Sequence, residues 1–294
     1  VLEGQILNAE THEPLPFVNI LMLSKKIGTS TDENGKFKWA VPPNVLNEKV
    51  QISYLGFSEK ILKVADFKDA KILLTPKVGN LKEVFLYQIQ DKNHKKINSF
   101  RGKEPIGLGN FSGGAYPSSV ARYYPKPSEF KNAFVKAVTV YYFNTSLQQS
   151  QGSSKYRLRI LSTTPKGAPG ADILAENLII QKGQAQFRTK IDLLKYRIKI
   201  PENGFFVAVE HLFIPENEFT EVKTFKVNDS LIYRDVPLVK YAPIFKGVLE
   251  ENNSDFKSYY RSISGWKMMN HLDSSNRLLE GKIPAPAFKV EITN

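Results

Sequence analysis

Histidine and cysteine, the side chains that most often bind transition metals or act as base and nucleophile, offer little chemistry in this sequence. The chain has no cysteine, which excludes a disulfide framework, thiolate metal sites and a cysteine nucleophile. Its four histidines are not spaced as metal ligands, for example as H-x-x-x-H; they are His12, His94, His211 and His271. We therefore predict no metal site on these side chains and no cofactor.

Serine and carboxylate side chains form no recognisable catalytic constellation. Ser262-Ile263-Ser264-Gly265 lacks the first glycine of the G-x-S-x-G motif, and the closeness of His271 and Asp273 in sequence is not triad geometry. Acidic residues gather at 210–221 and 250–255, and two facing carboxylates can hydrolyse a glycoside. Because carboxylates in exposed loops of β-proteins are usually only solvated, we predict that the protein is not an enzyme.

One acidic segment resembles the start of a calcium-binding loop. It reads Asp32-Glu33-Asn34-Gly35, but the twelfth position, where an EF-hand loop has a bidentate glutamate, is Pro43. Asn and Gly supply the positive φ angles of a hairpin turn, so we predict a turn here. The sequence leaves open the alternative of a structural calcium ion elsewhere, for instance at Asp172 or Glu176.

Aromatic residues give the clearest hint of ligand binding. Neighbours in a strand point to opposite faces, so one ring of each adjacent tyrosine pair must face away from the core. An exposed ring can stack on a sugar or anchor a protein partner, and a nearby arginine can bind an acidic or hydroxylated ligand; the alternative is that the second ring only covers a neighbouring strand. The candidate ligand-binding residues are Tyr123, Tyr124, Tyr259, Tyr260, Arg261 and Trp266.

The net charge of +12 raises the question of nucleic acid. Only nine of the 41 basic residues are arginine, the residue best suited to bidentate phosphate and base contacts. The lysines are spread along the chain, and their tight cluster at 92–96 lies in a polar stretch. We predict no nucleic-acid partner. A solvated surface, or attraction to anionic envelope polymers or to a membrane surface, accounts for the charge.

The elements that would position these residues are short strands. KYRLRIL alternates, with Tyr156, Leu158 and Ile160 on one face and Arg157 and Arg159 on the other. The pattern predicts no amphipathic helix, and no apolar run approaches the roughly 20 residues of a transmembrane helix. Because 294 residues exceed one typical core, we predict an all-β protein with a sandwich at 1–79, a polar and Gly-rich linker at 80–115 and a second sandwich at 116–294.

The first 79 residues carry an ordered series of motifs. They include Gly4, Pro14-Leu15, Gly28-Thr29, Gly35-Lys36-Phe37 and Gly56-Phe57. The series resembles the carboxypeptidase-regulatory-like domain, a transthyretin-like Greek-key β-sandwich at the N-termini of TonB-dependent outer-membrane transporters and other exported bacterial proteins. The resemblance implies that this module binds or positions rather than catalyses. It also implies a location in the periplasm or at the outer membrane of a Gram-negative bacterium.

Two further resemblances bear on the rest of the chain. Leu81–Leu86 is similar to the segment that follows this module in the transporters, but the roughly 210 residues that remain are too few for their barrel of about 22 strands. Residues 116–294 resemble jelly-roll-like accessory β-sandwiches of exported bacterial proteins, some of them carbohydrate-binding modules. We therefore expect a non-enzymatic interaction or scaffolding protein, a component or accessory subunit of an envelope assembly, with other envelope proteins as partners. The alternative is a module that recognises glycans through exposed aromatics.

Overall fold

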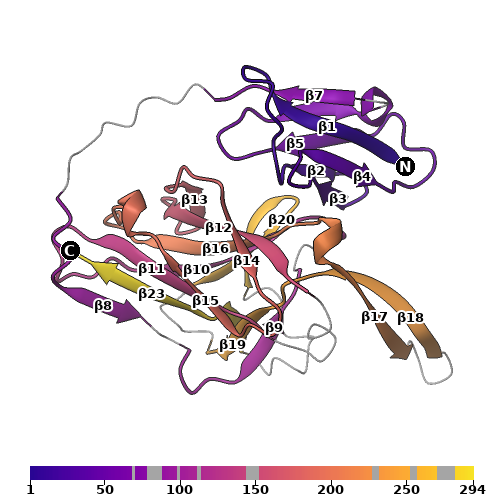
Figure 1. Cartoon of the computed structure of the whole chain (residues 1–294). Coiled ribbons are helices and arrows are strands. Elements are labelled where there is room, and N and C mark those ends of the chain that lie inside the picture. Colours follow the sequence, from indigo (N-terminus) through magenta and orange to yellow (C-terminus); the bar gives the residue numbers. More distant parts are fainter. Residues whose placement is uncertain are drawn as a thin grey trace.

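The computed structural model confirms the all-β class (Figure 1). It describes residues 1–67, 70–77, 88–97, 100–110, 114–143, 152–226, 232–251, 257–269 and 282–294. The segment Leu81–Leu86 lies outside these ranges, and so do His271 and Asp273. None of the helices within them is long and apolar enough to cross a lipid bilayer.

The N-terminal body is a sandwich of two sheets. One sheet has the order β4-β1-β7, formed by β1 (Leu2–Asn8), β4 (Lys36–Trp39) and β7 (Ala70–Leu74), with β1 and β7 parallel. The other has the order β3-β2-β5-β6, formed by β2 (Asn19–Met22), β3 (Ile27–Ser30), β5 (Lys49–Ser53) and β6 (Lys60–Lys63). A 3-10 helix, η1 (Val64–Phe67), precedes β7. Alternation fixes which side chains enter the core: Phe37 and Trp39 are buried, whereas Lys36 and Lys38 are exposed.

The second body is a larger sandwich whose main sheet has the order β13-β12-β16-β10-β20-β21, with β14 also paired to β12. Its strands are β10 (Ser119–Tyr124), β12 (Ser154–Thr163), β13 (Pro169–Asp172), β14 (Leu178–Lys182), β16 (Phe205–His211), β20 (Ser258–Ser262) and β21 (Gly265–Met268). The inner face of this sheet packs on a core that includes Leu158, Val207 and Phe245.

Two smaller sheets close the other side of that core. The first has the order β15-β11-β23-β8 and the second β22-β19-β9. Their strands are β8 (His94–Ile97), β9 (Pro105–Leu108), β11 (Phe134–Tyr141), β15 (Arg188–Asp192), β19 (Phe245–Glu250), β22 (Ile283–Pro286) and β23 (Phe288–Thr293). A short 3-10 helix, η2 (Leu194–Tyr196), follows β15.

Part of the stretch predicted as linker, 80–115, is β-structure. β8 pairs with β23 and β9 pairs with β19, so both strands belong to the sheets of the second body. Their sequences are short and polar or Gly-containing, and the strands form because partner strands between 137 and 199 positions away supply the hydrogen bonds. Local sequence carries no signal for such pairing.

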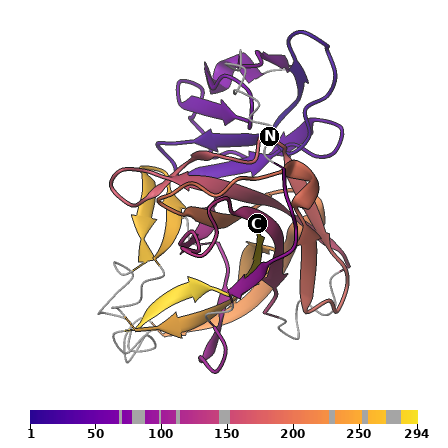
Figure 2. The ribbon, with the colours of Figure 1, turned by 90° about the vertical axis from the view of Figure 1, so that its left-hand side faces the viewer.

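A two-stranded ribbon extends away from the second body, at the lower right of Figure 1. It consists of β17 (Glu218–Lys226) and β18 (Ile232–Tyr241), which pair with each other in antiparallel register. A 3-10 helix, η3 (Pro215–Asn217), leads into it. Figure 2 shows the N-terminal body seated on top of the second body.

Candidate functional site

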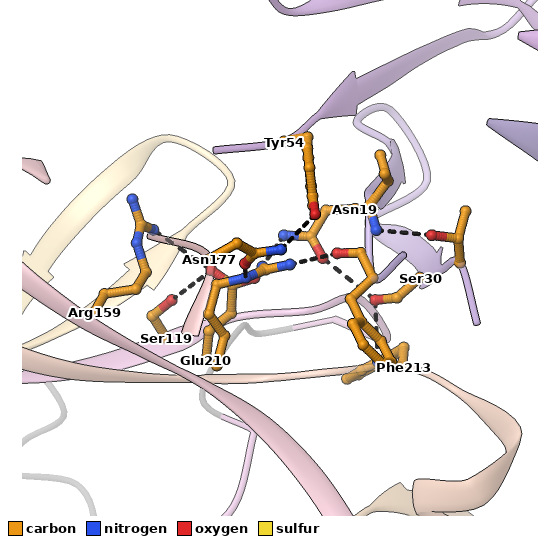
Figure 3. Close-up of polar contacts among 12 residues, drawn as sticks. Asn19, Ser30, Tyr54, Ser119, Arg159, Asn177, Glu210 and Phe213 are labelled. Carbon is orange, nitrogen blue, oxygen red and sulfur yellow. Dashed lines mark hydrogen bonds and ion pairs between the residues drawn. The ribbon is translucent and has the colours of Figure 1, made fainter. Parts of the chain in front are cut away.

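The two bodies meet where sheet β3-β2-β5-β6 faces the outer face of the main sheet (Figure 3). The predicted alternation of KYRLRIL holds: Tyr156, Leu158 and Ile160 enter the core of the second body. Arg157 and Arg159 are therefore on the outer face, and the N-terminal body covers them there. Glu210 reaches the same place because it follows Ala208 on the outer face of β16.

Glu210 is the centre of this junction and is only 5% exposed. Its carboxylate accepts hydrogen bonds from Asn19 Nδ2 at 2.7 Å, from Arg157 Nη1, and from Arg159 Nη1 at 3.4 Å. Burial alone would raise the pKa of Glu210, but the charges of Arg157 and Arg159 and the Asn19 hydrogen bond outweigh it and hold that pKa below its usual value. The carboxylate is therefore ionised and joins the two bodies.

Arg157 extends this network in both directions. Its Nη2 donates to the Phe17 carbonyl of the N-terminal body, and its Nε donates to Asn177 Oδ1. Asn177 Nδ2 in turn donates to the Tyr54 hydroxyl at 2.5 Å. Figure 3 shows Tyr54 and Asn19 reaching from the N-terminal body toward Asn177 and Glu210. Arg157 thus contacts the N-terminal body directly through the Phe17 carbonyl and indirectly through Asn177 and Tyr54.

A second set of contacts lies beside the ion pairs. The Ser30 amide donates to the Phe213 carbonyl at 3.0 Å, and the Phe213 amide donates to Ser30 Oγ at 3.1 Å. Phe17 packs with Leu212 and Ile214 in a small apolar cluster. The junction therefore combines charged, backbone and apolar contacts.

Gly28 permits a close approach of the two bodies. A Cβ at this position would lie 2.7 Å from the Ile20 carbonyl oxygen and 2.9 Å from Tyr116 Cβ. We expect Gly28→Ala to lower the free energy of unfolding by about 1–3 kcal/mol, because the strand and the facing segment must move apart. Urea denaturation measures the change. Gly152→Ala is the matched control, since a Cβ there meets no atom within 4 Å; equal effects of both substitutions would contradict the prediction.

Next to the junction the two bodies leave a groove of about 300 Å³. Strands β2 and β5 and the loop 54–57 form one wall, and residues 116–119, β12, β16 and the β20–β21 hairpin form the other. Four basic side chains and three carboxylates line it: Lys77, Arg157, Arg159, Arg261, Glu59, Asp172 and Glu210. Arg159 binds Asp172 with Nε at 2.8 Å and Nη2 at 2.6 Å.

Two of the predicted ligand-binding tyrosines are core residues, and their prediction is corrected. Tyr124 is fully buried, and its hydroxyl donates to the Phe288 carbonyl at 2.9 Å. Tyr259 is buried against Phe206, with its hydroxyl donating to the Gly167 carbonyl at 3.2 Å. Burial raises the pKa of both phenols. Neither ring is available to stack on a ligand.

The other four predicted residues are partly or fully accessible, but they do not form one cluster. Tyr123 packs on Phe206 with ring centroids 5.5 Å apart, and Tyr260 packs against the main core. Arg261 lies directly opposite Trp266 in the β20–β21 hairpin. Of these four, only Arg261 lines the groove.

Sequence reasoning missed the residues that build the junction. Arg157 and Arg159 were assigned to the correct face of their strand, but nothing in the pattern said that a second body covers that face. Glu210 carried a usable signal, because it is a charged residue inside the otherwise apolar segment FFVAVEH. Buried charges are normally paired, so such a residue predicts a buried basic partner.

Several carboxylates of the acidic clusters considered for catalysis are engaged in ion pairs. Glu216 binds Lys155 Nζ at 3.0 Å, Glu221 pairs with Lys240, and the buried Glu250 pairs with the buried Arg122. Over the part of the chain that the structure describes, no group of three or more His, Asp or Glu side chains is arranged to hold a metal ion.

The β17–β18 ribbon is a second accessible surface. Thr220 faces Val239 and Val222 faces Pro237 on one of its faces, and Val222 and Val239 are 56% and 58% exposed. On the opposite face Glu221 pairs with Lys240. Within the described ranges no third strand pairs with either edge of the ribbon.

Comparison with known proteins places the first body in a family. Residues 2–86 match the family model of the CarboxypepD_reg-like domain, which confirms the resemblance seen in the motifs. No curated protein matches the chain. Among solved structures it is similar to the cysteine protease and lectin-like domains of Cwp84, a surface layer associated protein of Clostridium difficile, at 10% identity and a TM-score of 0.39. That match covers 69% of this chain and 36% of the other.

Proposed function

We propose that this chain is a non-enzymatic interaction protein of the bacterial cell envelope, a component of a periplasmic or outer-membrane assembly that binds another envelope protein through the β17–β18 ribbon. The observation that carries the proposal is the ribbon itself, a long two-stranded sheet whose apolar face points to solvent. The CarboxypepD_reg-like body at 2–86 supports a positioning role, since the junction holds it firmly against the second body.

The ribbon has the properties of an element that is completed by a partner. A two-stranded sheet alone is marginally stable in water, and soluble proteins normally protect strand edges. Pro237 lacks the amide hydrogen that a ladder needs and lies in β18. β17 is therefore the edge best suited to receive a strand from a partner protein, and Val222 and Val239 supply apolar contact area beside it.

The test compares two charged double variants of the full chain. Immobilised wild-type protein is expected to retain a defined envelope protein from detergent-solubilised membranes of its own organism, and Val222→Glu/Val239→Glu is expected to retain at least tenfold less, because the new charges would have to be buried. Leu46→Glu/Ile61→Glu is the matched control, since both side chains are exposed apolar residues of the N-terminal body.

The control must retain the partner at the wild-type level. Failure of wild-type protein to retain any envelope protein, or equal retention by both double variants, would contradict the proposed function. Fractionation of cells with an antibody against the chain tests the location separately, with recovery in the periplasmic or outer-membrane fraction as the expected result.

A second candidate function, glycan binding, draws support from the Arg261–Trp266 pair. Trp266 is half-buried beside an exposed arginine at the end of the main sheet, and an aromatic ring next to a hydrogen-bond donor suits a sugar. Binding on a glycan array that is lost in Trp266→Ala and retained in the control Tyr141→Ala would favour this function over the first.

A further inference from the structure

We propose that the groove between the two bodies binds a carboxylate presented by an acidic peptide segment of a partner protein, and that Arg261 is the residue that binds it. The inference rests on the proposed binding role, but it concerns a different surface from the β17–β18 ribbon. The proposed function says nothing of this groove, and the inference assigns it a class of ligand.

Arg261 makes no direct contact with a carboxylate of the groove, although the charges of Glu210, Asp172 and Glu59 act on it from a distance. Glu210 is engaged by Arg157 and Arg159, and Asp172 is engaged by both nitrogens of the Arg159 fork. Among the residues that the structure describes, no carboxylate forms an ion pair or hydrogen bond with the Arg261 guanidinium. Two of the three carboxylates are thus already paired, and Arg261, Lys77 and the third carboxylate, Glu59, line the remaining space.

The position of Arg261 also places like charges near each other. It lies on β20 with its side chain toward the groove, and the positive charge of Arg159 acts on it from the neighbouring part of the sheet. Partial desolvation in the groove and this repulsion lower the pKa of Arg261, and the charges of Glu210, Asp172 and Glu59 oppose the shift. An arriving carboxylate would relieve the repulsion, and a guanidinium fork can bind both of its oxygens.

The remaining lining favours a peptide over a sugar. The apolar Leu21, Leu23 and Ile263 line the groove together with the polar Gln51, Ser53 and Ser262, which suits a peptide that carries both apolar and polar side chains. A sugar needs a free ring face. The ring of Tyr54 is instead flanked by Phe57, with centroids 5.3 Å apart, and by the Arg157 guanidinium, 5.9 Å from its centroid.

The size of the groove agrees with a short segment. Its volume of about 300 Å³ is at the lower end of the range of ligand pockets, roughly 300–1,000 Å³. A few residues of extended peptide fit this space, and a folded domain does not. Lys77, which is exposed at the side of the N-terminal body, is placed to meet a second acidic residue of the same segment.

The test titrates isotope-labelled full-length chain with a capped peptide, acetyl-Leu-Glu-Leu-Glu-amide, and follows amide resonances by NMR. The glutamate peptide is expected to shift resonances of groove residues, and its glutamine counterpart is expected to bind at least tenfold more weakly. Arg261→Gln should weaken binding of the glutamate peptide by at least tenfold, and Arg261→Lys by less, because it keeps the charge and loses the fork. Arg101→Gln, at an exposed arginine in a turn remote from the groove, should leave binding unchanged.

Three outcomes would overturn the inference: equal binding of the two peptides, equal behaviour of Arg261→Gln and Arg101→Gln, or binding of digalacturonate in place of the peptide. The last outcome would assign the groove to an acidic glycan. The well-dispersed spectrum of each variant establishes that it is folded. The ribbon variant Val222→Glu/Val239→Glu should bind the peptide normally, so failure of the groove and failure of the proposed function give different results.

Discussion

Replacing Glu210 with glutamine is expected to lower the free energy of unfolding by about 3–5 kcal/mol, the cost of removing one partner from a buried ion pair. Glutamine can still accept the hydrogen bond from Asn19, so the loss comes from the charge. Arg159 keeps Asp172, whereas Arg157 keeps only neutral acceptors, the Phe17 carbonyl and Asn177. An uncompensated guanidinium then remains buried between the two bodies.

Urea denaturation at pH 7, followed by tryptophan fluorescence, measures this change. The two tryptophans report on different bodies, because Trp39 lies in the N-terminal core and Trp266 packs on the main sheet of the second body. The control is Glu216→Gln, which breaks the more exposed pair with Lys155 and should cost at most about 1 kcal/mol. Equal losses in Glu210→Gln and Glu216→Gln would refute the assignment of Glu210 as the centre of the junction.

His211 is expected to make the protein sensitive to acid. Its ring is fully buried, 4.9 Å from the ring of Phe245 with the two planes tilted by 65°. Among the described residues neither ring nitrogen makes a hydrogen bond of normal geometry, although backbone groups of Pro243 and Ser118 lie close to the ring. Burial lowers the pKa of His211 from 6.5 to about 4. The folded protein therefore holds this ring neutral at a pH where the unfolded chain binds a proton.

The direction of the effect follows from this difference in protons bound. Stability from the neutral ring is fully present above pH 6.5 and is lost as the pH falls toward 4, because the unfolded state takes up the proton first. The shift of about 2.5 pH units corresponds to roughly 3 kcal/mol at 1.36 kcal/mol per unit. Below pH 4 the folded state is protonated as well, so His211 adds no further pH dependence to the unfolding free energy.

Unfolding free energies measured from pH 7 to pH 4 test this prediction. The difference between wild type and His211→Phe isolates the contribution of the ring, since the other titrating groups are common to both. Between pH 7 and pH 4 the variant should lose roughly 3 kcal/mol less unfolding free energy than wild type. His12→Asn, at an exposed turn residue with positive φ, is the control and should keep the wild-type slope. If His211→Phe also keeps the wild-type dependence of unfolding free energy on pH, the prediction that the folded protein holds this ring neutral is wrong.

The fold class was predictable because strand alternation is written in neighbouring residues. Phe37 and Trp39 against Lys36 and Lys38, and the faces of KYRLRIL, needed no knowledge of the rest of the chain. The same alternation could not decide which tyrosine of a pair enters the core, because both members are equally apolar. Tyr124 and Tyr259 are inside because their hydroxyls find backbone carbonyls there, and those carbonyls belong to distant segments.

The candidate site was harder to predict from the sequence, because it too depends on contacts between distant segments. The role of Glu210 depends on Asn19 in one body and on Arg157 in the other, and sequence shows residue types without showing which strands face each other. The edge strands β8 and β9 were missed because their partners, not their own residues, make them strands. At the junction the sequence shows one signal, the charged Glu210 in an apolar strand. This signal predicts a buried ion pair but does not identify the basic partner.

The hydrogen bond between Asn19 and Glu210 joins positions that are 191 residues apart. Closing so long a loop is entropically costly, and the bond has value only once β2 and β16 are already in their own sheets. We therefore expect the junction to form after both bodies have folded and to break before either opens. The Asn19–Glu210 and Arg157–Phe17 contacts span the two bodies, whereas the Arg157–Glu210 ion pair joins facing residues of β12 and β16 within the second body. We expect loss of the spanning contacts to raise the unfolding rate more than it lowers the folding rate.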